Sequence, residues 1–262
     1  MENNSVLHTE NLSIGYSEKK SETVIASNIN ISLERGKLIA LVGANGIGKS
    51  TLLRTITGIQ KPLLGTVLLR QQPIESYSIS AMARELSIVL TEKLPPGNLT
   101  VYELIALGRQ PYTNWIGKLT DEDLLKIQMA IDLTEVGHLT DKKHYEISDG
   151  QLQKVLVARA LAQDTPLIIL DEPTTHLDLL HKVSLFRLLK KLSRETGKCI
   201  LFSTHDIDMA IQLSDEMIVM MPGKLVQENP SNLIASGIFD ALFKDENIVF
   251  DAERGKFIFK NL

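Results

Sequence analysis

A glycine-rich run at residues 43–50 has the residue types and the spacing to hold a phosphate group. It matches the pattern G-x-x-x-x-G-K-S, with an apolar run at 37–42 before it and a helical pattern at 51–56 after it. Glycines let the backbone curl so that successive N–H groups point at phosphate oxygens. The N-terminus of the following helix presents its positive dipole end to the same anion. Because strand and helix are in place, the run predicts a nucleotide-phosphate site rather than a chance turn.

Two side chains of this run have specific chemical roles. Lys49 adds a point charge at the β- and γ-phosphates, and the Ser50 hydroxyl can ligate Mg²⁺. The sequence therefore predicts ATP and Mg²⁺ as ligands. The predicted contacts to the nucleotide are Gly43, Ala44, Asn45, Gly46, Ile47, Gly48, Lys49, Ser50 and Thr51.

Two acids follow a second apolar run, at 167–170. In an open α/β sheet, ligands collect at the carboxyl ends of the strands, so Asp171 and Glu172 are expected beside the phosphate loop. Asp171 is expected to hold Mg²⁺, directly or through water, and Glu172 to polarise the attacking water as general base. Such a pair alone also fits a solvated loop, but the phosphate loop upstream favours a catalytic site.

His205 ends a third apolar run, at 199–204, and should reach the same edge of the sheet. A histidine there can donate a hydrogen bond to a γ-phosphate. The strand-end position favours this role over that of a surface or capping residue. Four other histidines lack such a context and are expected to be structural or solvated: His8, His138, His144 and His181.

The elements that must position these residues alternate along the chain. Short apolar runs between longer helical patterns are typical of a mostly parallel sheet covered by helices. Residues 6–35 are expected to form antiparallel strands with a turn around 17–21. Residues 95–163 show helical periodicity and no clear strand, so they are expected to form a helical subdomain inserted into the α/β core of one domain, 1–262. The predicted buried strands are 37–42, 86–90, 167–171, 199–204 and 217–221.

Composition excludes several classes of protein. The formal net charge is only −4 with both signs mixed along the chain, so a dedicated nucleic-acid binder is disfavoured. A single cysteine, Cys199, excludes an internal disulfide and fits a reducing compartment. The N-terminus lacks the features of a secretory signal, and no apolar run reaches the roughly 18–20 residues that cross a bilayer. We expect a soluble protein whose membrane role requires a partner.

Residues 147–151, Ile-Ser-Asp-Gly-Gln, and the helical run after them resemble the signature motif of ABC ATPases, usually L-S-G-G-Q. The ordered set around it matches the same family over nearly the whole chain: Walker A at 43–50, Walker B at 167–172, a D-loop at 175–178 and the switch histidine His205. Tyr16 matches the aromatic that stacks on adenine. The resemblance implies a P-loop (RecA-like) ATPase core with an antiparallel β subdomain and an inserted helical subdomain.

The resemblance also implies a homodimer that closes head-to-tail around two ATP molecules. Each signature helix start would then face the γ-phosphate bound to the other subunit. Ser148 is a good N-cap, and a glycine lets the backbone approach an anion closely. The residues carried over to this half of the site are Ser148, Gly150, Gln151 and Asp178.

Two positions depart from the family pattern. Asp149 stands where the signature usually has glycine, and a carboxylate near the γ-phosphate should repel it. Glu92 aligns with the glutamine of the Q-loop, and it is expected to ligate Mg²⁺ with added charge. We expect both changes to tune affinity and rate without abolishing hydrolysis.

Residues 99–112 resemble a run found in importers of ferric siderophores, haem and cobalamin. Helix packing accounts for its apolar positions, whereas Gly108, Arg109, Pro111 and Tyr112 are expected to form an exposed turn that docks a permease helix. The implied partners are integral-membrane permease subunits and, indirectly, an extracytoplasmic substrate-binding protein. The implied location is the cytoplasmic face of the inner membrane, as a peripheral subunit.

Three alternatives remain open. Non-transport ABC ATPases of chromosomes and repair insert a long coiled coil between Walker A and signature, and residues 51–146 show no sustained heptads. Translation types usually carry two cassettes, whereas this chain has one. A separate-subunit exporter is not excluded by the sequence. A non-hydrolysing nucleotide binder is disfavoured by Glu172, although Asp149 and Glu92 keep it open.

Overall fold

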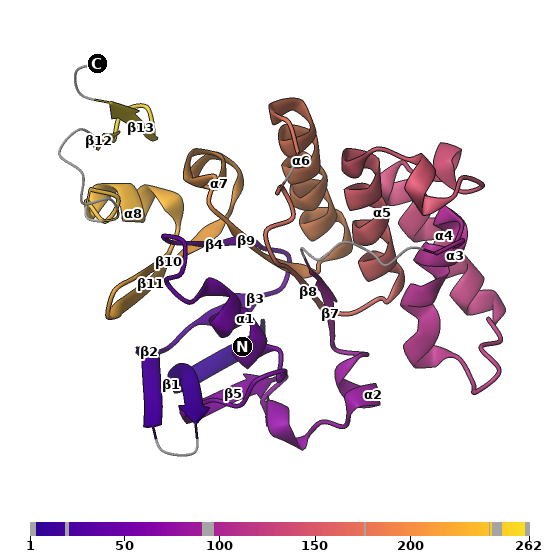
Figure 1. Cartoon of the computed structure of the whole chain (residues 1–262), viewed down its shortest axis with the longest axis horizontal. Helices are drawn as coiled ribbons and strands as arrows, with labels where there is room; N and C mark the ends of the chain where they lie inside the picture. The colour runs from indigo at the N-terminus through magenta and orange to yellow at the C-terminus, as the bar shows by residue number, and fades with distance from the viewer. Residues whose placement is uncertain are drawn as a thin grey trace.

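The structure, a computed structural model, describes residues 4–18, 21–90, 97–175, 177–240, 242 and 248–259. Its central sheet has the strand order β11-β10-β4-β9-β8-β7 and crosses the middle of Figure 1. The strands from β10 to β7 are parallel, and β11 joins β10 antiparallel. They lie within one residue of the expected bounds: β4 Leu38–Val42, β7 Leu86–Val89, β8 Leu167–Leu170, β9 Cys199–Thr204, β10 Glu216–Met221; β11 spans Lys224–Glu228.

The apolar runs are continuous because β4, β8 and β9 are buried on both faces. In β4, Leu38, Ala40 and Val42 belong to one hydrophobic cluster, while Ile39 and Leu41 belong to the other. This alternation is the two-residue period of a strand between two covered faces. The first cluster includes side chains of α5 (Asp149–Ala162) and α6 (Leu179–Thr196), and the second those of α1 (Lys49–Ile56).

A second sheet, with the order β2-β1-β5-β6 and β3 beside β1, lies below the central sheet in Figure 1. The antiparallel pairing of β1 and β2 confirms the expectation for residues 6–35. Residues 57–85, for which the sequence predicts no element, contain β5, β6, the 3₁₀ turn η1 and the short helix α2. The bounds are β1 Ser5–Glu18, β2 Ser21–Ile29, β3 Ser32–Glu34, β5 Leu64–Leu69, β6 Gln72–Pro73, η1 Ile74–Ser76 and α2 Ile79–Met82.

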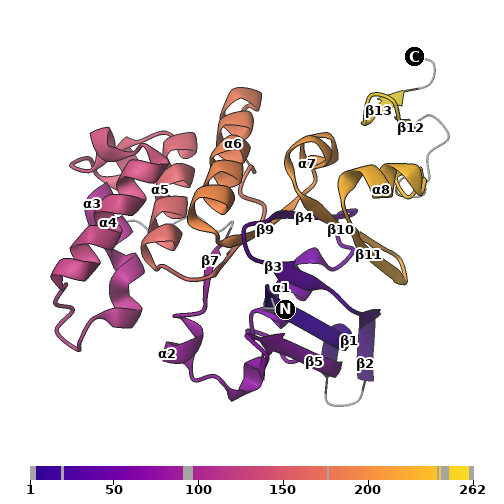
Figure 2. The same ribbon diagram turned by 180° about the vertical axis from the view of Figure 1, so that it is seen from behind.

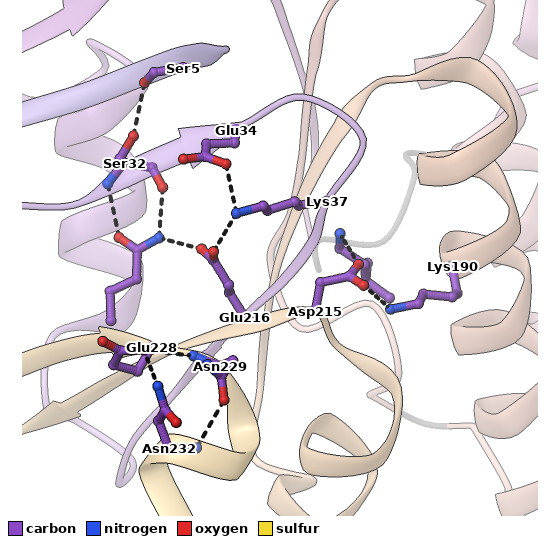
Figure 3. A network of polar contacts seen from close by, with 12 residues as sticks. Ser5, Ser32, Glu34, Lys37, Lys190, Asp215, Glu216, Glu228, Asn229 and Asn232 are labelled. Atoms are coloured by element: carbon purple, nitrogen blue, oxygen red, sulfur yellow. Dashed lines mark hydrogen bonds and ion pairs between the residues drawn. The ribbon is translucent and has the colours of Figure 1, made fainter. Parts of the chain in front are cut away.

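A polar network joins the two sheets (Figure 3). Lys37, just before β4, extends Nζ to within 2.6 Å of Glu34 Oε2 and 2.5 Å of Glu216 Oε1. Gln227 of β11 exchanges hydrogen bonds with the backbone of Ser32 and donates to Glu216 Oε2 at 2.8 Å. Lys37 and Glu216 stand where β4 and β10 begin. The network therefore holds the amino edge of the central sheet and leaves the carboxyl edge to other groups.

The described residues from 97 to 163 contain helices, turns and one isolated bridge, Thr100 to Lys143, and no strand. They lie on the right of Figure 1. The sequence sets the start of each helix, since Thr100, Thr120 and Ser148 form capping boxes with the residue three positions later. The elements are α3 Val101–Ala106, η2 Leu107–Tyr112, α4 Asp121–Thr134, η3 Gly137–Leu139, η4 His144–Glu146 and α5.

The last part of the chain adds helices whose buried residues share the hydrophobic cluster of α5 and α6, and Figure 2 shows them to the right of α6. The helices are α7 Ile207–Leu213 and α8 Pro230–Ala235, and the strands β12 Ile248–Asp251 and β13 Lys256–Phe259 pair antiparallel. Phe239 and Phe250 pack ring to ring at 4.8 Å between centroids. Among the helices that the structure describes, none is both long and apolar enough to cross a membrane.

Candidate functional site

The phosphate loop leaves the carboxyl end of β4 and enters α1 through glycines that no other residue could replace without strain. Gly43, Gly46 and Gly48 have φ angles of 156°, 77° and 112°, where side chains are unfavourable. A β-carbon on Gly48 would lie 2.4 Å from Ile25 Cγ2. Gly48 occupies the N-cap of α1 in the left-handed conformation, so the loop turns directly into the helix.

Lys49 is the buried cation of this loop, with 6% of its surface exposed. Its Nζ donates to the carbonyl oxygens of Gly43 at 2.9 Å and Ala44 at 3.4 Å, and lies 3.9 Å from Glu172 Oε1. Burial lowers the pKa of Lys49, and the negative charges of Glu172 and Asp171 oppose that shift. The loop thus curls around its own ammonium group, which points toward the acids after β8.

Asp171 and Glu172 follow β8 at the same edge, because β4, β9 and β8 are neighbours in the sheet. The Ser203 hydroxyl donates a hydrogen bond to the Asp171 carboxylate at 2.6 Å. The oxygen of that hydroxyl in turn accepts a hydrogen bond from the Glu172 N–H at 2.8 Å. Glu172 has a φ angle of 45°, which is uncommon for a residue other than glycine. The Thr175 hydroxyl donates to Glu172 Oε2 at 3.3 Å.

His205 follows β9 and completes the cluster. Its Nδ1 lies 3.8 Å from Glu172 Oε2, so Glu172 stands between Lys49 on one side and His205 on the other. The structure therefore brings together the three side chains that the sequence marked as catalytic. Asp206, the residue after His205, forms an ion pair with Lys182 of α6 at 2.9 Å, which links this end of β9 to the helix.

Tyr16 lies in β1 at the start of α1. Its hydroxyl is 3.0 Å from Thr51 Oγ1, so the ring stands beside the phosphate loop with about half of its surface exposed. This places an exposed aromatic face next to the predicted nucleotide contacts.

The start of α5 holds the predicted signature residues. Ser148 accepts the N–H of Gln151 at 3.3 Å, and Gln151 Oε1 accepts the N–H of Ser148 at 3.0 Å. Ser148 and Asp149 are exposed, whereas Gly150 is buried against His181. In Figure 1, α5 lies with the helices on the right and α1 lies below the central sheet. The signature residues and the phosphate loop of one chain are therefore separate from each other.

Asp178 caps α6 and accepts both the N–H of His181 at 2.9 Å and its Nδ1–H at 2.8 Å. The sequence predicts only that His181 is structural or solvated, and these two hydrogen bonds give it a structural role. A histidine three residues after an N-cap aspartate is the sequence signal that was available. Backbone and side-chain hydrogen bonds from His181 hold the pKa of the Asp178 carboxyl below its ordinary value.

Comparison with known proteins shows which family the chain belongs to. Residues 26–175 match the family described as ABC transporter. The chain belongs to the ABC transporter family. It is an ATP-binding and ATP-hydrolysing member of that family.

Two curated relatives extend the match over almost the whole ABC ATPase. The chain is similar to the iron(3+)-hydroxamate import ATP-binding protein of Bacillus subtilis, 37% identical over 95% of this chain and 92% of that protein. It is 32% identical to the ferric enterobactin transport ATP-binding protein of Escherichia coli, over 94% of this chain and 89% of that protein.

Solved ABC structures have the same fold. One chain of a metal-chelate type ABC transporter in an inward-facing conformation superposes with a TM-score of 0.79 at 26% identity, covering 97% of this chain and 96% of that one. A dimeric ATP-binding cassette bound to ADP and phosphate superposes with a TM-score of 0.71 at 27% identity, covering 86% of this chain and 98% of that one. The α/β core with its antiparallel and helical parts, expected from the sequence, is thereby confirmed.

One expectation for this ABC ATPase is wrong. Arg109 does not form an exposed docking turn, because only 3% of its surface is exposed. Its Nε donates to Asp123 at 2.8 Å, an Nη donates to the carbonyl of Ala162 at 2.9 Å, and its guanidinium lies 3.9 Å above the ring of Tyr112. The arginine therefore ties η2, α4 and α5 together inside the helical part.

Gly108 and Asp123 complete this internal role. A β-carbon on Gly108 would lie 2.3 Å from the carbonyl oxygen of Arg159, so the glycine is required by close packing on α5. Burial raises the pKa of the Asp123 carboxyl, but hydrogen bonds from Thr120 and Arg109 outweigh it and hold that pKa below its ordinary value.

The residues present fit a magnesium ion. Ser50 and Asp171 both line a cavity of about 450 Å³ at the carboxyl edge of the sheet. Mg²⁺ is usually held by one or two carboxylates together with substrate phosphates and water, so two protein donors at the phosphate loop suffice. Among the residues that the structure describes, no group of three or more His, Cys, Asp or Glu side chains forms a separate metal site. Glu92 and His176 lie outside the described residues.

Proposed function

We propose that this ABC ATPase binds ATP at residues 43–51, with Mg²⁺ on Ser50 and Asp171, and powers an importer of ferric siderophores or similar metal chelates. The observation that carries the ATPase mechanism is the position of Glu172, between Lys49 at 3.9 Å and His205 at 3.8 Å. The cargo class is supported by the relatives, whose names place them in iron(3+)-hydroxamate and ferric enterobactin transport.

The chemistry is in-line displacement at the γ-phosphorus. Water attacks, its proton passes to Glu172, and the bond to the β–γ bridging oxygen breaks to release ADP and phosphate. Lys49 moves from the loop carbonyls to the β- and γ-phosphates, and His205 donates to a γ-phosphate oxygen. Bound Mg²⁺ neutralises charge that develops on the phosphates. Tyr16 stacks on adenine, and Glu92 serves as a further metal ligand.

One chain supplies half of each site, and a homodimer completes it. Ser148, Gly150, Gln151 and Asp178 would face the nucleotide of the second copy. Support comes from Ser148 and Asp178, which cap α5 and α6 with exposed side chains. The dimeric ATP-binding cassette that superposes on this chain shows that the fold can pair in this family.

Because Arg109 is buried, the permease must dock elsewhere, and we propose an apolar surface beside the metal site. Ile59 and Leu90, exposed by 62% and 49%, line the cavity that also contains Ser50 and Asp171. A neighbouring cavity of about 740 Å³ shares Ile59 and extends to Ile79 and Met82. We propose that a short cytoplasmic helix of the permease binds this apolar surface. A helix bound there would contact the cavity that Ser50 and Asp171 line.

In this proposal the chain is a single ABC ATPase domain, 1–262, with its helical subdomain at approximately 95–163. It works as a peripheral subunit on the cytoplasmic face of the cell membrane. The extracytoplasmic substrate-binding protein contacts the permease and reaches this subunit only through it. No partner role for nucleic acid is proposed.

Reconstitution tests the proposal. The ATPase is combined with its cognate permease in liposomes, with the cognate binding protein and a ferric siderophore outside. We expect ATP inside the liposomes to drive uptake of labelled iron, and the Glu172→Gln complex to show none. ATP-driven release of a loaded substrate, without uptake, would assign the chain to an exporter instead.

A further inference from the structure

Ser203 is a buried hydroxyl at the centre of the site, and no motif accounts for it. It lies in β9 between Phe202 and Thr204, with no exposed surface. Its hydroxyl donates to Asp171 Oδ1 at 2.6 Å and accepts the N–H of Glu172 at 2.8 Å. A single side chain therefore contacts both acids after β8.

The register of the sheet explains why this residue reaches them. Leu170 of β8 pairs with Phe202 of β9, so the next residue of each strand, Asp171 and Ser203, stand side by side. On the other side, the N–H of Asp171 donates to the carbonyl of Val89 in β7 at 2.9 Å. The backbone of Asp171 is thus held by β7 and its carboxylate by β9.

The hydrogen bond to Glu172 supports an unfavourable backbone. At φ 45°, Glu172 leaves the extended path of β8, and residues in this region persist only where their surroundings hold them. The Ser203 oxygen accepts the N–H of this strained residue. An apolar residue at 203 would leave that N–H and one carboxylate oxygen without this partner.

We propose that Ser203 is a positioning residue for hydrolysis, which holds the metal ligand Asp171 and the general base Glu172 in one fixed relation. The proposal rests on the proposed function of those two acids. His205 lies two residues later in the chain, so a shift of this part of β9 when His205 meets the γ-phosphate reaches both acids through one hydroxyl.

The test compares Ser203→Ala with Ser87→Ala in steady-state ATP hydrolysis over a range of ATP and Mg²⁺ concentrations. Ser87 is the matched control, since it is a buried serine of β7 whose hydroxyl accepts from Thr165 at 3.1 Å, away from the acids. We expect Ser203→Ala to lower kcat about 10- to 100-fold, the loss typical of a misplaced reacting group. Its KM for ATP should stay within about two-fold, and half-maximal rate should require more Mg²⁺. Ser87→Ala should match the wild type in kcat, in the KM for ATP and in the Mg²⁺ concentration that gives half-maximal rate.

The outcomes separate this inference from the proposed function. A wild-type rate and Mg²⁺ dependence for Ser203→Ala overturn the positioning role, and so does an equal loss in Ser87→Ala. If the wild type itself does not hydrolyse ATP, the proposed function fails first. If Ser203→Ala does not fold, Ser203→Cys repeats the comparison with a side chain of similar shape and a weaker hydrogen-bonding group, and the same loss in kcat is expected.

Discussion

The imidazole of His181 occupies the space that a β-carbon on Gly150 would take, 2.5 Å from its Cδ2. Close approach to an anion was the sequence-based reason for a glycine here, and the structure adds a second reason within the chain. Because His181 also bonds Asp178 at 2.8 Å, the signature helix and the D-loop meet through one ring. Both elements are proposed to face the second copy, so this contact sets their relative position.

Gly150→Ala should therefore lower kcat for ATP hydrolysis by about ten-fold, because the new methyl group displaces the ring and shifts α5 against α6. Gly150 has no left-handed φ angle, so backbone strain does not contribute. His181→Ala opens the space, and the double variant should be no slower than His181→Ala alone. Losses that simply multiply in the double variant would show that the contact does not couple the two residues.

Arg109→Ala should destabilise the fold by about 3–5 kcal/mol, because it leaves the Asp123 carboxylate buried without its cation. Arg194→Ala removes an exposed arginine and should change the free energy of unfolding by less than about 0.5 kcal/mol. Urea unfolding measures both. Equal, small effects would mean that the buried pair does not hold the helical part together.

The same pair predicts a pH dependence. The pKa of Asp123 is held below its ordinary value in the fold, so its ionised form stabilises the native state above its unfolded pKa of about 4. This contribution is lost as the pH falls through the lower, folded pKa. The wild type should thus lose more stability than Arg109→Ala when the pH is lowered from about 5 to about 3. Parallel curves for the two proteins would contradict the assignment.

Asp149→Asn should lower the KM for ATP about two- to five-fold at low salt, because an exposed charge interaction is worth about 0.2–1 kcal/mol. The substitution removes a charge that, in the proposed dimer, faces the nucleotide of the second copy, and it keeps the size of the side chain. The effect should shrink as salt screens the charge. A KM that is unchanged at low salt would show that the carboxylate points away from the phosphates.

Tyr16→Ala should raise the KM for ATP, since stacking of a base on an aromatic ring is worth about 1–3 kcal/mol. Tyr16→Phe keeps the ring and removes the hydroxyl that meets Thr51. It should bind ATP like the wild type. Loss of affinity in Tyr16→Phe would assign the effect to the hydrogen bond with Thr51 rather than to stacking.

The parallel strands of the central sheet and the phosphate loop were predictable because their signals are local: buried parallel strands are continuous apolar runs, and the loop needs glycines at fixed positions. The contacts of Ser203 with Asp171 and of His181 with Gly150 were not, because the two residues of each contact lie 32 and 31 positions apart in sequence. A polar residue within the apolar run 199–204 was the one visible sign of the first. The expectation of an exposed Arg109 was wrong because no local sequence pattern indicates that Asp123, 14 residues later, is its buried partner.

In the proposed mechanism, Glu172 activates the attacking water in a nucleotide-linked dimer. The most direct measurement is the rate of phosphate release by purified Glu172→Gln, with ATP binding and molecular mass recorded on the same sample. We predict retained ATP binding, a stable dimer in ATP and Mg²⁺, and turnover reduced at least about 100-fold. Turnover near the wild-type rate would show that Glu172 does not activate the water.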